Sequence, residues 1–177
     1  MNAPSLTEPS LSSPMPPPLL RHHFCRTSAL SFELPPSWRL EQESEGASTY
    51  LETVEEAGSS DREHQPARLV IQSFIVAPGL NDAPQALIQR VMADSSNAAA
   101  SAVVRTLTVD QQPARLLVQH RQDSSGRWML HFQVFVQLDQ VVCSITGKGA
   151  VAREAELLPL FEAATHSIRF IPVSRGT

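Results

Sequence analysis

The chain has 177 residues, of which 42% are apolar and 18% charged, and its formal net charge is −4. This length and composition suit one globular domain of ordinary size. Acidic and basic residues are mixed along the chain without a basic stripe, and no apolar run approaches the roughly 20 residues that cross a bilayer. We therefore expect no nucleic acid among the partners and no stable insertion into a membrane.

Residues 1–27 are rich in proline, and we predict an extended or disordered tail that is either passive or docks a partner. The start of the chain lacks the basic residues and the continuous apolar block of an export signal. The two cysteines, Cys25 and Cys143, make a poor disulfide framework. Both observations favour a cytoplasmic protein. The prolines of the tail are Pro4, Pro9, Pro14, Pro16, Pro17 and Pro18.

We expect one domain over residues 28–171, followed by a short C-terminal tail at 172–177. Its first elements are strands at 31–34 and 48–54, a polar segment at 55–66 without apolar periodicity, and an apolar strand at 68–76. A helix then begins near Asn81 or Asp82, because Pro84 suits a first turn. One apolar stripe continues along this helix and consists of Leu87, Ile88, Val91 and Met92.

The second half of the domain has strands at 102–109, 115–121, 128–138 and 140–146, and then a helix at 153–167 with one apolar face. The predicted order of elements is βββαββββα. Strands outnumber helices, and each helix is apolar on one side only. We therefore predict an α+β fold, in which an antiparallel β-sheet carries two main helices packed on one face.

The last two strands, at 128–147, contain Asp139 at their turn as the only charged residue. A turn at Asp139 and Gln140 places Gln137 opposite Val142 and sends alternate side chains to opposite faces. One face is then an apolar core, with Phe132, Val134, Val136, Val141, Cys143 and Ile145, joined by Leu116 and Val118 from the preceding strand. The other face carries Gln133, Phe135, Gln137, Ser144 and Thr146, joined by Leu117, Gln119, Met129 and His131.

This second face is unusual because an open sheet normally presents charged residues to water. A face that mixes amides with apolar side chains suits the apolar helix of a protein partner, since its amides can satisfy stray polar groups. The same pattern also fits a face that is covered by the tail, by the segment at 55–66, or by an identical subunit.

Catalytic and metal-binding patterns are weak. Cys143 is expected on the core side of a strand, where a thiol is usually an apolar filler. His120 and His131 fall on opposite faces, and Gly147-Lys148-Gly149 lacks the further residues of a phosphate loop and is typical of a turn. His22, His23 and Cys25 have no second cluster that would complete a metal site. We expect no enzyme activity, no cofactor and no metal.

Several segments carry a resemblance to a known superfamily. SFELPPSW, ARLVIQSFIV before DAPQALIQRVMAD, QPARLLVQHRQ, the long WMLHFQVFVQLDQVVCSITG hairpin and the closing LLPLFEAATHSIRF resemble the PsbP/DcrB-like superfamily over residues 28–171. The branch that the chain looks most like is the Eag chaperones of type VI secretion. Members of this branch shield the apolar N-terminal transmembrane segments of secreted effectors on a sheet face, typically as dimers.

The resemblance implies a bacterial effector-binding chaperone, with a possible homodimer, whose partner-binding surface is the second sheet face. Two other readings stay open. One is a scaffold or accessory subunit that docks a larger assembly through the proline-rich tail, and the other is a small-ligand-binding PsbP/DcrB-like protein. The implied partner-binding residues are Gln72, Phe74, Gln119, His131, Gln133, Phe135, Gln137, Ser144 and Thr146.

Overall fold

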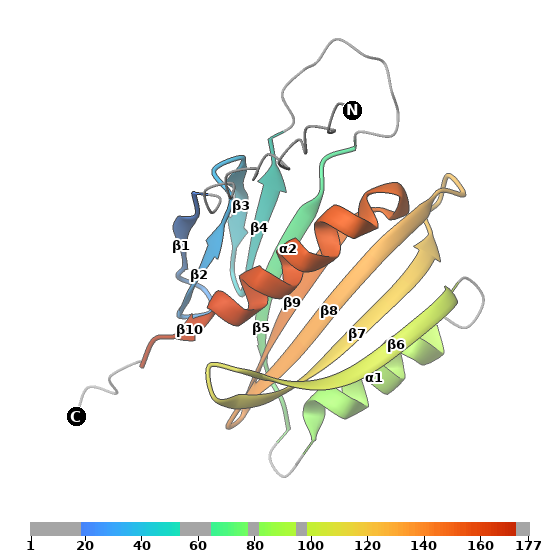
Figure 1. The fold of residues 1–177 in the computed structure, drawn as a ribbon. Coiled ribbons are helices and arrows are strands. Elements are labelled where there is room, and N and C mark those ends of the chain that lie inside the picture. The colour runs from blue at the N-terminus through green and yellow to red at the C-terminus, as the bar shows by residue number, and fades with distance from the viewer. Residues whose placement is uncertain (1–18, 54–64, 78–81, 95–98, 173–177) are drawn as a thin grey trace, which may run out of the picture.

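The computed structural model describes residues 19–53, 65–77, 82–94 and 99–172. Within these residues the fold is built on a large antiparallel sheet of seven strands, with a small three-stranded sheet beside it (Figure 1). Across the large sheet, the strands are β3 (Trp38–Ser44), β4 (Ala47–Glu52), β5 (Arg68–Ile75), β9 (Val141–Ala150), β8 (Trp128–Leu138), β7 (Gln112–Gln122) and β6 (Ala99–Val109). The predicted α+β fold class is confirmed.

The small sheet consists of β1 (Arg21–Cys25), β2 (Leu30–Leu34) and β10 (Arg169–Phe170), in that order. The expectation of a tail up to residue 27 does not hold for β1, which pairs along its whole length with β2. Cys25 is fully buried in the main core, and this contact explains why the strand belongs to the domain. The rest of the predicted tail, residues 1–18, lies outside the described residues.

The first face of the large sheet is covered by α2 (Glu154–Ser167), which follows the short 3-10 turn η1 (Val151–Arg153) and crosses the sheet in front of β8 and β9 (Figure 1). The main core lies between them. As predicted, Phe132, Val134, Val136, Cys143 and Ile145 are buried there, and Leu116 and Val118 pack in the same cluster. Val141 is the exception: at the end of β9 beside the turn, its side chain is 36% exposed.

Glycines let α2 approach β9 closely. A Cβ atom placed on Gly147 would come within 2.7 Å of the Phe161 ring, and one on Gly149 would overlap the Leu157 side chain. The prediction that Gly147-Lys148-Gly149 forms a turn is therefore wrong, because these residues continue β9 beneath the helix. Glycine in a strand interior often marks such a close approach of another element.

The second face of the sheet carries α1 (Ala83–Asp94), which packs on β7 and β8. Leu87, Ile88 and Val91 of the predicted stripe make this contact, whereas Met92 is 41% exposed. Ile88 of α1 is buried in one cluster with Leu117, Phe135 and Val142, which alternate along their strands with residues of the main core. The expectation that both helices cover one face is therefore wrong. A one-sided helix needs an apolar surface, but its own sequence does not say which face of the sheet provides it.

The strand β3 was missed by the sequence analysis, which placed strands only at 31–34 and 48–54 before the polar segment. β3 pairs with β4 through a turn at Gly46, whose φ of 78° favours glycine. From Arg39 to Ser44 its residues are exposed, so the alternation that identifies a half-buried strand is absent. A charged edge strand of this kind discourages pairing with another chain.

Candidate binding groove

The nine predicted partner-binding residues do share one face of the large sheet, which is the face that carries α1. The register of β8 with β9 is the predicted one, with Gln137 opposite Val142 and Phe135 opposite Ser144. The same rows continue onto β5, where Gln72 lies opposite Ser144 and Phe74 opposite Val142, and onto β7, where Gln119 lies opposite His131.

One end of this face is already occupied by α1. Phe135 is buried beneath it, and Phe74 packs against the same cluster. The Gln137 Oε1 atom accepts a hydrogen bond of 3.1 Å from the backbone N–H of Ala83, at the start of the helix. Phe135 and Gln137 therefore hold the protein's own helix, and in this conformation α1 stands between Phe135 and any partner.

The start of α1 is also fixed by charge. The Asp82 carboxylate accepts a hydrogen bond of 3.1 Å from the backbone N–H of Gln85 and forms a 3.0 Å ion pair with Arg115 of β7. A carboxylate at this position satisfies a free N–H group of the first turn and interacts favourably with the helix dipole. The covered end of the face is thus anchored by both packing and polar contacts.

Within the part of the chain that the structure describes, the rest of the face forms an open groove beside α1, over β5, β9 and β8. Its first part has a volume of about 330 Å³. A second part of about 500 Å³ reaches the start of β5, and the two parts form one groove because Arg121, His131 and Lys148 line both. The first part is lined by Val70, Gln72, Val91, Arg121, His131, Gln133, Thr146 and Lys148.

Two glutamines of this face have buried side-chain atoms without a hydrogen-bond partner among the described residues. Gln119 is 1% exposed and neither its Oε1 nor its Nε2 atom has a partner, and the buried Oε1 of Gln133 has none either. Leaving a buried polar atom unpaired costs about 1–3 kcal/mol, so native structures seldom do so without a reason. Gln133 lines the groove, where a bound partner could supply the missing donor.

His131 lies on the floor of the groove and is uncharged at neutral pH. Burial lowers the pKa of its imidazole to about 4, and the nearby charges of Lys148 and Arg121 add to this effect. His120, one strand position away on β7, faces the other side of the sheet, and its Nε2 atom lies 3.1 Å from a Glu154 carboxylate oxygen at the start of α2. The two histidines therefore cannot act on one bound molecule.

The sequence analysis missed the basic residues at the far end of the groove. The expected uncharged face holds within the last hairpin, but Lys148 follows directly after it, and the register places Arg68 of β5 opposite Lys148. Arg121 of β7 also lines this end. Continuing the face by one more alternate position beyond Thr146 would have identified Lys148. Only the pairing of β5 with β9 brings Arg68 to it.

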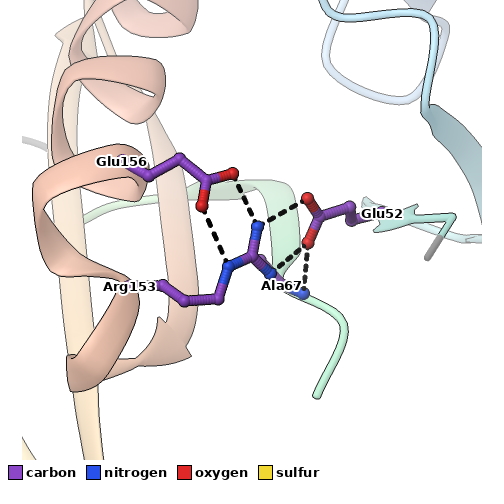
Figure 2. Close-up of polar contacts among 4 residues, drawn as sticks. All are labelled: Glu52, Ala67, Arg153 and Glu156. Carbon is purple, nitrogen blue, oxygen red and sulfur yellow. Dashed lines mark hydrogen bonds and ion pairs between the residues drawn. The ribbon is translucent and has the colours of Figure 1, made fainter. Parts of the chain in front are cut away.

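The start of β5 is held in place from the opposite side by a charged network, shown in Figure 2. The Arg153 guanidinium donates to both carboxylate oxygens of Glu52, at 2.7 and 2.8 Å, and also pairs with Glu156. Glu52 in turn accepts a hydrogen bond of 3.2 Å from the backbone N–H of Ala67. Burial raises the pKa of Glu52, but its bonds to Arg153 and Ala67 outweigh this and lower it on balance. The network positions the residue that precedes Arg68.

Other reactive side chains of the described residues lie away from the groove. Cys143 is buried in the main core, and this burial raises the pKa of its thiol to about 12. Among the described residues, no three His, Cys, Asp or Glu side chains are grouped in a way that could hold a metal ion. Nor does that part of the chain contain a helix long and apolar enough to span a membrane.

The fold is shared with several solved structures. No family model matches the chain, and no curated protein matches it in sequence. LpqN of Mycobacterium tuberculosis, involved in cell envelope biogenesis, is similar with a TM-score of 0.62 and 16% identity over 87% of this chain and 90% of LpqN. Mog1 has a TM-score of 0.60 and 10% identity, over 88% of this chain and 98% of Mog1.

The cyanobacterial PsbP protein of Synechocystis has a TM-score of 0.56 and 14% identity, over 90% of this chain and 98% of that protein. The chain therefore has a Mog1/PsbP-like fold, which agrees with the superfamily that its sequence resembles. At these levels of identity the likeness concerns the fold alone. A shared fold does not by itself determine a function.

Proposed function

We propose that this protein is a non-catalytic binding protein, specifically a cytoplasmic chaperone or adaptor that shields the apolar, transmembrane-like N-terminal segment of a secreted effector. The observation that carries the proposal is the open groove beside α1. It combines apolar side chains such as Val70 with amides such as Gln72, and it contains the unpaired Gln133 Oε1 atom. Such a lining can bury apolar surface and still satisfy polar groups of a bound polypeptide.

The geometry favours a helix as the bound element. β5, β9 and β8 are each paired on both sides within the sheet, so a partner in the groove cannot add as a further strand. It must dock through its side chains, as an amphipathic or apolar helix does in a groove. Burial of apolar surface contributes about 25 cal/mol per Å². A groove that covers the apolar side of such a helix therefore competes with its aggregation in water.

The direct test is capture of a probe segment of about 20 alanines and leucines fused to the N-terminus of a soluble fluorescent protein, since this length would span a bilayer. Gln72→Arg with Thr146→Arg would place two charges in the groove without touching the α1 cluster. We expect co-purification of the probe with the wild-type protein and at least about a tenfold loss of affinity in the double variant.

The matched control is Gln42→Arg with Thr108→Arg, which adds the same charge at exposed positions of β3 and β6 outside the groove. This variant should capture the probe as the wild type does. Equal binding by both double variants would overturn the proposal. The structure also explains why Phe135 should not be used for this test: it is buried under α1, and its replacement would destabilise the fold.

A second copy of the chain is a further partner that we propose. The outer edge strand β6 exposes Val103 and Val104, by 45% and 42%, on opposite faces of the sheet. Exposed valines on an unpaired edge are typical of a strand that associates with another. Light scattering should give the mass of a dimer, and Val104→Lys should give a monomer. A monomer for both proteins would contradict this part of the proposal.

A small-molecule ligand is the second candidate function, because the groove has the size of common ligand pockets, about 300–1,000 Å³. It predicts that the purified protein carries a ligand that native mass spectrometry detects.

The scaffold reading, in which the proline-rich tail docks a larger assembly, predicts that removal of residues 1–18 abolishes partner binding. The chaperone proposal predicts that this truncation leaves probe capture intact.

A further inference from the structure

The basic end of the groove is formed by Arg68, Arg121 and Lys148. It contains like charges on neighbouring strands, which sheets normally avoid. Arg68 and Lys148 are direct neighbours across β5 and β9, where two like charges destabilise the pair. No ion-pair partner for any of the three basic residues lies among the described residues. Departures from such local rules without compensation are expected at functional sites.

The one acidic side chain among the described residues lining this end is already engaged. The Asp123 carboxylate accepts hydrogen bonds from Ser125 and from the Arg127 backbone, and it pairs with the Arg127 guanidinium at 2.9 and 3.1 Å. These bonds hold the pKa of Asp123 well below its usual range. Asp123 therefore bonds within its own turn and does not neutralise the charges of Arg68, Arg121 and Lys148.

The basic end is continuous with the rest of the groove beside α1, because Arg121, His131 and Lys148 belong to the lining of both parts. A ligand that fits the whole groove therefore meets valines and amides, such as Val70, Val91 and Gln72, over one part and cations at the other end. A guanidinium recognises a carboxylate through two parallel hydrogen bonds, and an ammonium adds a compact charge.

We propose that the basic end is an anion subsite that takes the side chains of aspartate or glutamate residues flanking the apolar segment of the bound polypeptide. This inference rests on the proposed function and deepens it. The subsite would set the direction of the segment in the groove, with its acidic flank at the start of β5 and its apolar stretch beside α1. It would also make the rate of capture depend on ionic strength.

The test uses two synthetic peptides, each with a stretch of about 18 alanines and leucines, long enough to form a stable helix. One carries three aspartates at one end and the other three asparagines, and binding is followed by fluorescence anisotropy. The wild-type protein should bind the aspartate peptide at least about tenfold more tightly at about 50 mM salt. This preference should shrink at about 500 mM salt, where surface charges are screened.

Arg68→Gln with Lys148→Gln removes two of the three cations and should lose most of the preference for the aspartate peptide. The control Arg39→Gln with Arg105→Gln removes the same charge from exposed positions outside the groove and should keep the preference. Circular dichroism and thermal unfolding show that each variant is folded. Removing the repulsion between Arg68 and Lys148 should not lower the melting temperature, so lost preference cannot be ascribed to unfolding.

Equal binding of both peptides by the wild type would overturn the anion subsite while supporting the proposed function. Binding of neither peptide would overturn both. The segment between β4 and β5 contains acidic residues of the chain itself, including Glu55, Glu56 and Asp61. A preference that appears only after these three are neutralised would assign the subsite to that segment and overturn its assignment to a partner.

Discussion

The two faces of the large sheet are made by alternate residues of the same strands, yet they differ in how completely they are closed. On the α2 face, Phe132, Ile145 and Phe161 are buried in one continuous core. Glycines in β9 allow α2 to pack closely against the strand. On the other face, α1 covers one end, and no other described helix lies on it. The remainder is a groove in which Gln133 Oε1 and three basic side chains have no partner among the described residues. This contrast supports our proposal that one face maintains the fold while the other binds a partner.

The largest expected effect comes from Phe161, at the centre of the α2 face. Phe161→Ala should lower the free energy of unfolding by about 3–5 kcal/mol, because it removes a fully buried ring and leaves a cavity. Gln72→Ala, in the groove, should change it by less than about 0.5 kcal/mol, since this side chain is exposed. Chemical denaturation measures both. A similar loss in the two variants would contradict the division between the faces.

Gly147 tests how closely α2 must approach the sheet. Gly147→Ala should destabilise the fold by about 1–3 kcal/mol, because the added methyl group meets the Phe161 ring rather than a flexible chain end. Gly126→Ala is a useful comparison: Gly126 lies in an exposed turn with a φ of 80°, so its cost would come from backbone strain alone. Double substitution of Gly147→Ala with Phe161→Leu should recover part of the loss if the clash is the cause.

Arg153 tests the link between the core side and the basic end of the groove. Arg153→Met keeps much of the side-chain volume but removes the bonds to Glu52 and Glu156, and it should cost about 1–2 kcal/mol. It should also loosen the start of β5, which hydrogen exchange at Ala67 and Arg68 would detect. Unchanged protection there would mean that β5 is positioned by strand pairing alone.

At neutral pH His131 has the smallest expected effect, because its contribution appears as a dependence of stability on pH. Its pKa is about 4 in the folded protein and near 6.5 in an unfolded chain, so between these values the unfolded chain binds the additional proton. Its contribution to stability is therefore present above about pH 6.5 and is lost as the pH falls towards 4. His131→Asn should lose less stability over this interval than the wild type. If the stability of both proteins fell equally with pH, the lowered pKa of His131 would be contradicted.

Much of the fold could be predicted from local patterns. The turn at Asp139 and the alternation along 128–146 predicted the register of β8 with β9, and the apolar stripes predicted both helices. β1 and β3 were not predicted, because β1 follows a proline-rich segment and β3 is a polar edge strand without alternation. In both strands, pairing with a neighbour prevails over weak local preference.

The candidate site was predicted in part. The face that carries Gln72, Gln133 and Thr146 follows from the period of two along a strand, and the structure places these residues together in the groove. Phe135 and Gln137 contact α1 instead of lining the groove. This could not be predicted, because it depends on which side of the sheet the helix crosses.

The sequence by itself determined which side chains of each strand share a face, because alternation is a local property of extended backbone. Only the tertiary structure decided which helix covers which face, where the groove stays open, and that Arg68 lies beside Lys148. These outcomes depend on contacts between segments far apart in the chain, with β5 inserted between β4 and β9. Such contacts reflect the packing of the whole molecule, which no short stretch of sequence encodes.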